Sequence, residues 1–242
     1  MTDSSADDGV AVIVGVGPGL GASLVRKFAA AGYRVAAASR HPDRLDGLIE
    51  EVAGTGGTAK AYECDATNET SVEDLFSRTL SDLGEPAVAI YNAGAFVPNS
   101  ILETSSEEFQ RCWNIGCLGG FHVGRTAARR MVSRQSGSII FTGATAAHRG
   151  GARFHTLAVP KFGIRALAQS MARELGPQGV HVSHVVIDGL ILSEKHAGAV
   201  AERDEDTLLH PDSIADSYLM LHNQDRTAWT LELDLRPWSE RF

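Results

Sequence analysis

The sequence predicts one α/β domain whose core is a doubly wound parallel sheet of about seven strands. Short apolar runs, typical of strands buried on both faces, alternate strictly with longer segments striped at helical spacing. Such alternation requires right-handed crossovers that cover both faces of the sheet with helices. No linker, repeat or low-complexity stretch divides the 242 residues, a length at which α/β chains commonly form a single domain.

The expected strands are runs of apolar and β-branched residues. They lie at 10–14, 34–38, 59–63, 87–91, 138–142, 180–187 and 229–233. The first run contains only Val, Ala and Ile and leads directly into a glycine cluster. We therefore expect it to be a central strand, buried on both faces.

Apolar stripes at helical spacing fill the segments between the strands. The expected helices are 20–31, 45–52, 72–83, 106–131, 153–175 and one that opens at Pro211. A capping box formed by Ser105 and Glu108 marks the start of the fourth helix, and Gly176-Pro177 marks the end of the fifth.

The composition argues against several classes of partner. A net charge of −8 without a basic cluster disfavours a nucleic-acid or anionic-membrane surface. No apolar run reaches the roughly 18 residues of a membrane span, and sparse cysteines without metal or disulfide spacing fit a cytoplasmic protein. His181 and His184 face opposite sides of a strand, so no metal site is expected. We expect residues 1–8 to be a disordered acidic tail and residues 9–242 to form the domain.

A glycine-rich loop joins the first strand to the first helix. Gly15, Gly19, Leu20 and Gly21 stand where free backbone N–H groups and the helix dipole favour a pyrophosphate, and where a missing Cβ lets it approach. The alternative is a tight turn without a ligand. The position between a buried strand and a helix favours a dinucleotide.

The end of the second strand indicates which dinucleotide. Ser39 and Arg40 offer a hydroxyl and a guanidinium to a ribose 2′-phosphate, and no acidic residue is present for a free ribose. We therefore expect NADP(H), with NAD(H) as the second choice. The alternative for Arg40 is a solvated surface charge.

Further motifs occur in order along the chain: Asn-Ala-Gly at 92–94, Lys161 in a later helix, and Gly189 after the sixth strand. Together with the glycine loop they make the chain resemble the short-chain dehydrogenase/reductase family, from residue 10 to about residue 235. The resemblance implies a Rossmann-type fold and a nicotinamide coenzyme. It implies that Asn92 and Gly94 lie along the coenzyme.

The resemblance also assigns the remaining coenzyme contacts. Asp65 would accept a hydrogen bond from the adenine amino group. Backbone groups near Gly189 and Leu190 would bind the carboxamide, and the Ser193 hydroxyl would replace the family's Thr. Asp188 stands where the family has Pro, which is a departure from the pattern.

The catalytic side of the pattern is incomplete. The family uses a Tyr four residues before the Lys, a Ser thirteen residues before that Tyr, and an Asn in the long helix. Here Lys161 and Asn114 match, but the Tyr and Ser positions hold Leu157 and Ala144. The chain therefore resembles a divergent subgroup that keeps the Lys without the Tyr.

Two residues could take over part of the lost chemistry. Thr145 adjoins the Ser position and could orient a substrate oxygen. His155 could donate a proton, but only if 154–156 is still loop, because side chains two residues apart on a helix point in almost opposite directions. Pro160 suggests that this helix begins late.

We therefore expect an NADP(H)-dependent oxidoreductase that acts on a small organic carbonyl or alcohol through an atypical site. The alternatives are a silent nucleotide-binding regulator and a non-redox isomerase, lyase or cyclase. The unpatterned segment at about 190–210 should form the substrate lid. Apolar and small residues in the long helix, together with the family resemblance, suggest a homodimer or homotetramer.

Overall fold

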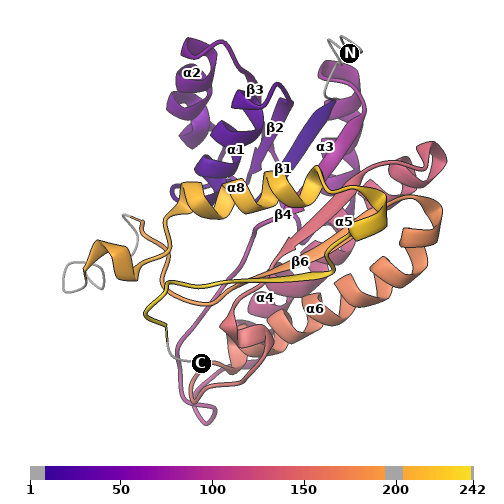
Figure 1. Ribbon diagram of the computed structural model, residues 1–242. Helices are drawn as coiled ribbons and strands as arrows, with labels where there is room; N and C mark the ends of the chain where they lie inside the picture. Colours follow the sequence, from indigo (N-terminus) through magenta and orange to yellow (C-terminus); the bar gives the residue numbers. More distant parts are fainter. Residues whose placement is uncertain (1–8, 194–203, 241–242) are drawn as a thin grey trace.

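The computed structural model describes residues 9–193 and 204–240. Seven parallel strands form one sheet in the order β3-β2-β1-β4-β5-β6-β7 (Figure 1), which confirms the predicted fold class. The strands are β1 Val10–Val14, β2 Arg34–Ser39, β3 Thr58–Glu63, β4 Pro86–Tyr91, β5 Ser138–Thr142, β6 His181–Ile187 and β7 Glu232–Leu235. The expected tail at 1–8 and residues 194–203 of the expected lid lie outside the described residues.

Helices cover both faces of the sheet (Figure 1). They are α1 Leu20–Ala30, α2 Asp46–Gly54, α3 Glu69–Asp82, α4 Ser106–Trp113, α5 Gly119–Arg134, α6 His155–Leu175 and α8 Pro211–His222. Because side chains alternate along a strand, Val12 of β1 packs in the core beneath α3, α5 and α6, whereas Ile13 packs beneath α1, α2 and α8. Each face thus has its own apolar core.

Two helices differ from the prediction. The long helix expected at 106–131 is divided by a π-helical turn, Asn114–Leu118, between α4 and α5. The helix expected from residue 153 begins at His155, because Arg153 has a left-handed backbone with φ of 67° and cannot continue a right-handed helix. Pro160 lies inside α6. The Ser105–Glu108 capping box is present as predicted.

The strand order reverses between β1 and β4, and ligands of doubly wound sheets bind at the carboxyl ends of the strands beside such a switch point. Here the backbone N–H of Asn92 donates to the carbonyl of Val14 at 2.8 Å. Across the described ranges, no helix has the length and apolar character that crossing a membrane requires.

Candidate active site

The glycine loop after β1 adopts a conformation that needs glycine. Gly15 and Gly19 have φ of 92° and 90°, in the left-handed region that disfavours other residues. A Cβ on Gly15 would lie 2.5 Å from the backbone nitrogen of Ala93, and one on Gly21 would lie 2.9 Å from the Cα of Val16. The loop is therefore packed closely against the 92–94 run.

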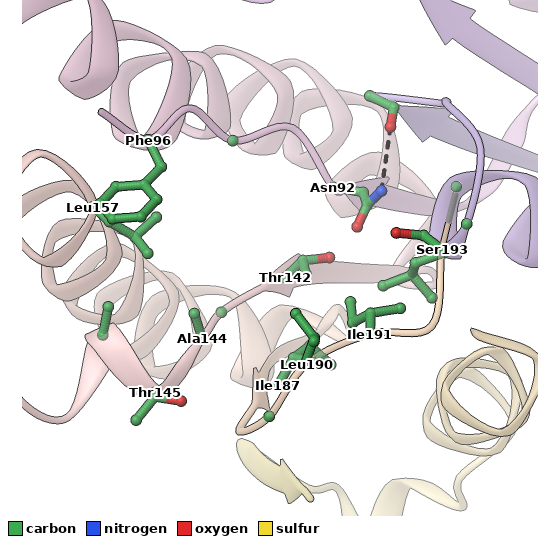
Figure 2. A pocket seen from close by; sticks show the side chains of 18 of the residues that line it. Asn92, Phe96, Thr142, Ala144, Thr145, Leu157, Ile187, Leu190, Ile191 and Ser193 are labelled. Atoms are coloured by element: carbon green, nitrogen blue, oxygen red, sulfur yellow. Dashed lines mark hydrogen bonds between the residues drawn. The ribbon is translucent and has the colours of Figure 1, made fainter. Parts of the chain in front are cut away.

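The loop leads directly into α1. No side chain caps this helix, and its first turn holds no acidic residue. Its first backbone N–H groups have no acceptor within the helix, which makes the start of α1 suited to an anion. Asn92 holds the loop in place, because its Nδ2 donates to the Gly15 carbonyl at 3.2 Å (Figure 2).

A cavity of about 780 Å³ opens in front of this loop. Gly15, Gly19, Leu20 and Gly21 line one part of it together with Asn92 and Gly94. Ser193 lies at the glycine-loop end, since a Cβ on Gly19 would be 3.3 Å from the Cβ of Ser193. The other end is mostly apolar, with Phe96 beside Leu157 and with Ile187, Leu190 and Ile191 along one wall (Figure 2).

The segment after β6 is held by the C-terminal part of the chain. Gly189 has φ of 153°, and a Cβ there would lie 2.8 Å from Cδ of Pro237. The backbone N–H of Asp188 donates to the carbonyl of Leu235 at 2.8 Å. Gly189 and Leu190, both predicted cofactor residues, line the large cavity.

A second cavity of about 250 Å³ lies on the other side of the glycine loop. Ser39, Arg40 and Asp65 line it, so the three residues predicted for the adenosine end come together. Oδ1 of Asp65 accepts hydrogen bonds from the backbone N–H and the hydroxyl of Thr67, at 2.9 and 2.8 Å. This turn fixes the carboxylate at the end of β3.

Lys161 is buried on α6 with 6% of its surface exposed. Its Nζ donates to the Thr142 carbonyl at 2.6 Å and lies 3.9 Å from the position that a Cβ on Gly94 would take. Burial lowers the pKa of Lys161 to about 8, because a low-dielectric environment disfavours the charged form. Lys161 thus lies behind the cavity wall at the 92–94 run.

The apolar end of the cavity carries the two residues at the positions where Tyr and Ser are expected from the sequence. Leu157 and Ala144 both line it, and Thr145 lies beside Ala144 at that end (Figure 2). The Thr145 hydroxyl donates to Oδ1 of Asp188 at 2.5 Å. Asp188 is buried with 6% exposed. The sequence showed Asp188 as a departure from the family pattern but gave no sign of its contact with Thr145.

Two candidate residues lie elsewhere. Asn114 lines a separate cavity of about 350 Å³ beside Arg40 and Asp65. In the same π-helical turn Gly116 faces α6, since a Cβ there would lie 2.6 Å from Cβ of Pro160. His155 is in the first turn of α6, and its Nε2 lies 2.8 Å from the Thr104 hydroxyl. Neither Asn114 nor His155 is among the residues that line the large cavity.

Comparison with known proteins shows which family this chain belongs to. Residues 9–202 match the family model described as short chain dehydrogenase. The chain belongs to the short-chain dehydrogenase/reductase family. A short-chain dehydrogenase structure from Rhodopseudomonas palustris is 36% identical, with a TM-score of 0.84 over 96% of this chain and 100% of the other.

Other members of the short-chain dehydrogenase/reductase family show similar agreement. A metagenomic short-chain oxidoreductase solved in complex with NADP is 25% identical, with a TM-score of 0.85 over 98% of this chain and 100% of the other. Secoisolariciresinol dehydrogenase of Forsythia intermedia is 30% identical over 83% of this chain and 73% of its own length. The (21S)-21-acetoxyl-apo-melianone synthase SDR of Melia azedarach is 34% identical over 78% and 69%.

Proposed function

We propose that this chain is an NADP(H)-binding oxidoreductase that acts on a small organic alcohol or carbonyl through an atypical site. The observation that carries the proposal is the glycine loop at the uncapped start of α1, where Gly15, Gly19 and Gly21 line the large cavity and present backbone rather than side chains to it. Bare amides at such a helix start suit a pyrophosphate. The large cavity continues from this loop to the apolar end.

The residues around the glycine loop support NADP(H) as the coenzyme. Ser39 and Arg40 would hold a 2′-phosphate, and Asp65 would accept from the adenine, since all three line one cavity. A related oxidoreductase of the same fold was solved with NADP. NAD(H) is the alternative coenzyme.

The nicotinamide, when bound, supplies or accepts a hydride. The chain's own contribution is to hold it: Asn92 and Gly94 along one side, Gly189, Leu190 and Ser193 on the other. Lys161 places an ammonium behind Gly94. Apolar side chains at the far end would exclude water from the substrate, which strengthens every electrostatic interaction there.

Compared with the catalytic set expected from the family resemblance, the proposed set of catalytic residues lacks two members. Lys161 is kept, whereas hydrocarbon occupies the Tyr and Ser positions at Leu157 and Ala144. Thr145 is the nearest hydroxyl and is proposed to orient the substrate oxygen. Because Asn114 and His155 line no part of the large cavity, we give neither of them a role in proton transfer.

A second candidate is a nucleotide-binding protein that performs no turnover, which the hydrocarbon at residues 144 and 157 favours. A non-redox isomerase, lyase or cyclase that uses the same pocket with the coenzyme as a scaffold is the third. Fluorescence titration with NADPH tests binding, and loss of nicotinamide absorbance over a panel of carbonyls tests turnover. Binding with turnover supports the oxidoreductase. Binding without turnover supports the silent or non-redox protein, and no binding of either coenzyme refutes all three.

We also propose that the protein forms a homodimer or homotetramer. Two of the residues of the long helix that suggested an interface in the sequence, Cys112 and Val123, are fully buried within the single chain and are not available for one. A different apolar set is exposed on the outer side of α4, α5 and α6, namely Trp113, Phe121 and Phe162. Light scattering should give at least twice the 25.8 kDa mass of one chain, and Phe162→Glu should lower it.

A further inference from the structure

The far end of the large cavity has a polar feature that the family pattern does not contain. Thr145 opens the short helical turn Thr145–Ala147 after β5, and Asp188 comes directly after the last residue of β6, 43 residues later in the chain. Their side chains meet at 2.5 Å, with the hydroxyl of Thr145 donating to Oδ1 of the carboxylate. Thr145 lines the cavity, and Asp188 is buried directly behind it.

The Asp188 carboxylate is held on its other side as well. Nε of Arg236 lies 3.4 Å from Oδ2, and the Arg236 side chain also donates to Asp234 at 2.8 Å. The backbone of Asp188 is fixed to Leu235. Because Oδ2 faces the Arg236 guanidinium, Oδ1 is the oxygen that accepts the hydrogen bond from the Thr145 hydroxyl. The hydrogen bond has this direction because a carboxylate has no proton to give.

A threonine hydroxyl has one proton and two lone pairs. Since the Thr145 hydroxyl uses its proton in the hydrogen bond to Asp188, its oxygen can only accept a hydrogen bond from a ligand. The other hydroxyls of the described cavity wall lie elsewhere: Thr142 pairs with the Tyr218 hydroxyl at 2.8 Å, and Ser193 lies at the glycine-loop end. The Thr145 hydroxyl is therefore an acceptor in surroundings that are largely apolar apart from Arg149 and Glu240.

We propose that the Thr145–Asp188 pair selects a ligand hydroxyl, so that the cavity binds an alicyclic or aromatic alcohol in preference to the matching ketone. This inference rests on the proposed function and names its substrate class. Thr145 contacts the ligand, and Asp188 is a positioning residue that fixes the direction of the Thr145 hydroxyl. A ketone oxygen would face a second acceptor with no proton between them, which costs the ketone a hydrogen bond.

The experiment measures dissociation constants of two matched pairs, 1-indanol with 1-indanone and cyclohexanol with cyclohexanone, by ligand-observed NMR. The protein is measured alone and with NADP⁺. We expect the alcohol of each pair to bind at least about tenfold more tightly, the contribution of one hydrogen bond to a charge-assisted acceptor. Thr145→Ser should keep this ratio, and Thr145→Val should bring it close to one.

Asp188→Asn gives the sharper result. The amide oxygen is expected to turn toward Arg236, which leaves the NH₂ group facing Thr145. Thr145 then accepts from the amide, and its own proton becomes free for a carbonyl. The alcohol preference should fall and turn toward the ketone, which a purely structural role of the pair would not produce. Thr55→Val, which removes a hydroxyl bonded to Val52 far from the cavity, is the matched control.

Three outcomes would overturn the inference: an equal or tighter affinity for the ketones in the wild type, a ratio that Thr145→Val leaves unchanged, or no binding of either alcohol. The proposed function is tested separately by fluorescence titration with NADPH and NADH. If neither coenzyme binds, the proposed function fails while the coenzyme-free ratios still decide this inference. If a coenzyme binds but each alcohol binds no more tightly than its matching ketone, the inference alone fails.

Discussion

The two ends of the large cavity are built from different parts of the chain. At the glycine-loop end the surface is backbone, and Gly15 and Gly21 allow its close packing, because a Cβ on either would collide with the backbone of Ala93 or Val16. At the far end the surface is side chains, among them Leu157, Ala144 and Thr145. An anion cradle needs only free amides and the absence of a side chain. Proton transfer needs one particular atom at one position, so a single substitution removes it.

The two ends also contribute differently to rate. A positioned general acid raises the rate by a factor of about 10²–10⁴. Holding two reactants together in the right geometry lowers the activation barrier by roughly 7–11 kcal/mol, which is the larger effect. Under the proposed function, the glycine-loop end holds the coenzyme and can therefore support slow hydride transfer without a positioned acid. The substrate end then decides which ligand is held, by shape and by the direction of its hydrogen bonds.

The largest expected effect comes from placing a phenol and a second hydroxyl at the substrate end. The double variant Ala144→Ser, Leu157→Tyr should raise carbonyl reduction by about 10²–10⁴, because a phenol would then stand four residues before Lys161 on the same helix face. Both positions line a cavity of about 780 Å³, which has room for a ring. NADPH consumption over a carbonyl panel measures the change.

The matched control is Ala144→Ser, Leu157→Phe, which adds the ring without the hydroxyl. Equal activity of the Tyr and Phe variants would show that the site has been rebuilt for another reaction.

The glycine-loop end is tested by adding one carbon. Gly15→Ala should weaken NADPH binding by about 100-fold or more, because the new Cβ would lie 2.5 Å from the nitrogen of Ala93 and because φ is 92°. Gly47→Ala in α2 is the control, since nothing lies within 4 Å of its Cβ position. It should keep NADPH binding and stabilise the fold slightly. Equal affinity of both variants would contradict the backbone account of this end.

These two ends also differ in how much the sequence could predict. The glycine loop and the strands were predicted because their signals are local: a buried run, then glycines, then a helical stripe. The π-helical turn Asn114–Leu118 was not predicted, because the apolar stripe of residues 106–131 is compatible with one continuous α-helix. The Thr145–Asp188 contact joins loops 43 residues apart, which only the parallel pairing of β5 and β6 brings together.

Lys161 lies between the two ends, and its burial predicts a pH dependence of stability. Its pKa falls from 10.5 to about 8 on folding, so between these values the unfolded chain binds a proton that the folded chain does not. Stability should therefore rise with pH across this window, by about 3 kcal/mol relative to Lys161→Met. Urea unfolding of both proteins at about pH 7.5 and about pH 10.5 measures this difference. If the stability difference between the wild type and Lys161→Met does not change with pH, Lys161 is solvated in the folded protein.

The smallest effect concerns the choice of coenzyme at the adenosine end. Arg40 lines the smaller cavity beside Ser39 but is exposed to solvent, so its bond to a 2′-phosphate is partly screened. Arg40→Ala should weaken NADPH binding about tenfold and leave NADH unchanged, as fluorescence titration with both coenzymes would measure.

Arg44→Ala is the control for this prediction, because Arg44 lies four residues further along, also exposed, and lines neither of the cavities that contain Arg40. A long-range charge effect would lower NADPH affinity equally in both variants, whereas a direct contact lowers it only for Arg40→Ala. An equal loss for NADPH and NADH on Arg40→Ala would instead mean that the guanidinium supports the adenosine as a whole. Only a loss confined to NADPH assigns the 2′-phosphate to Arg40.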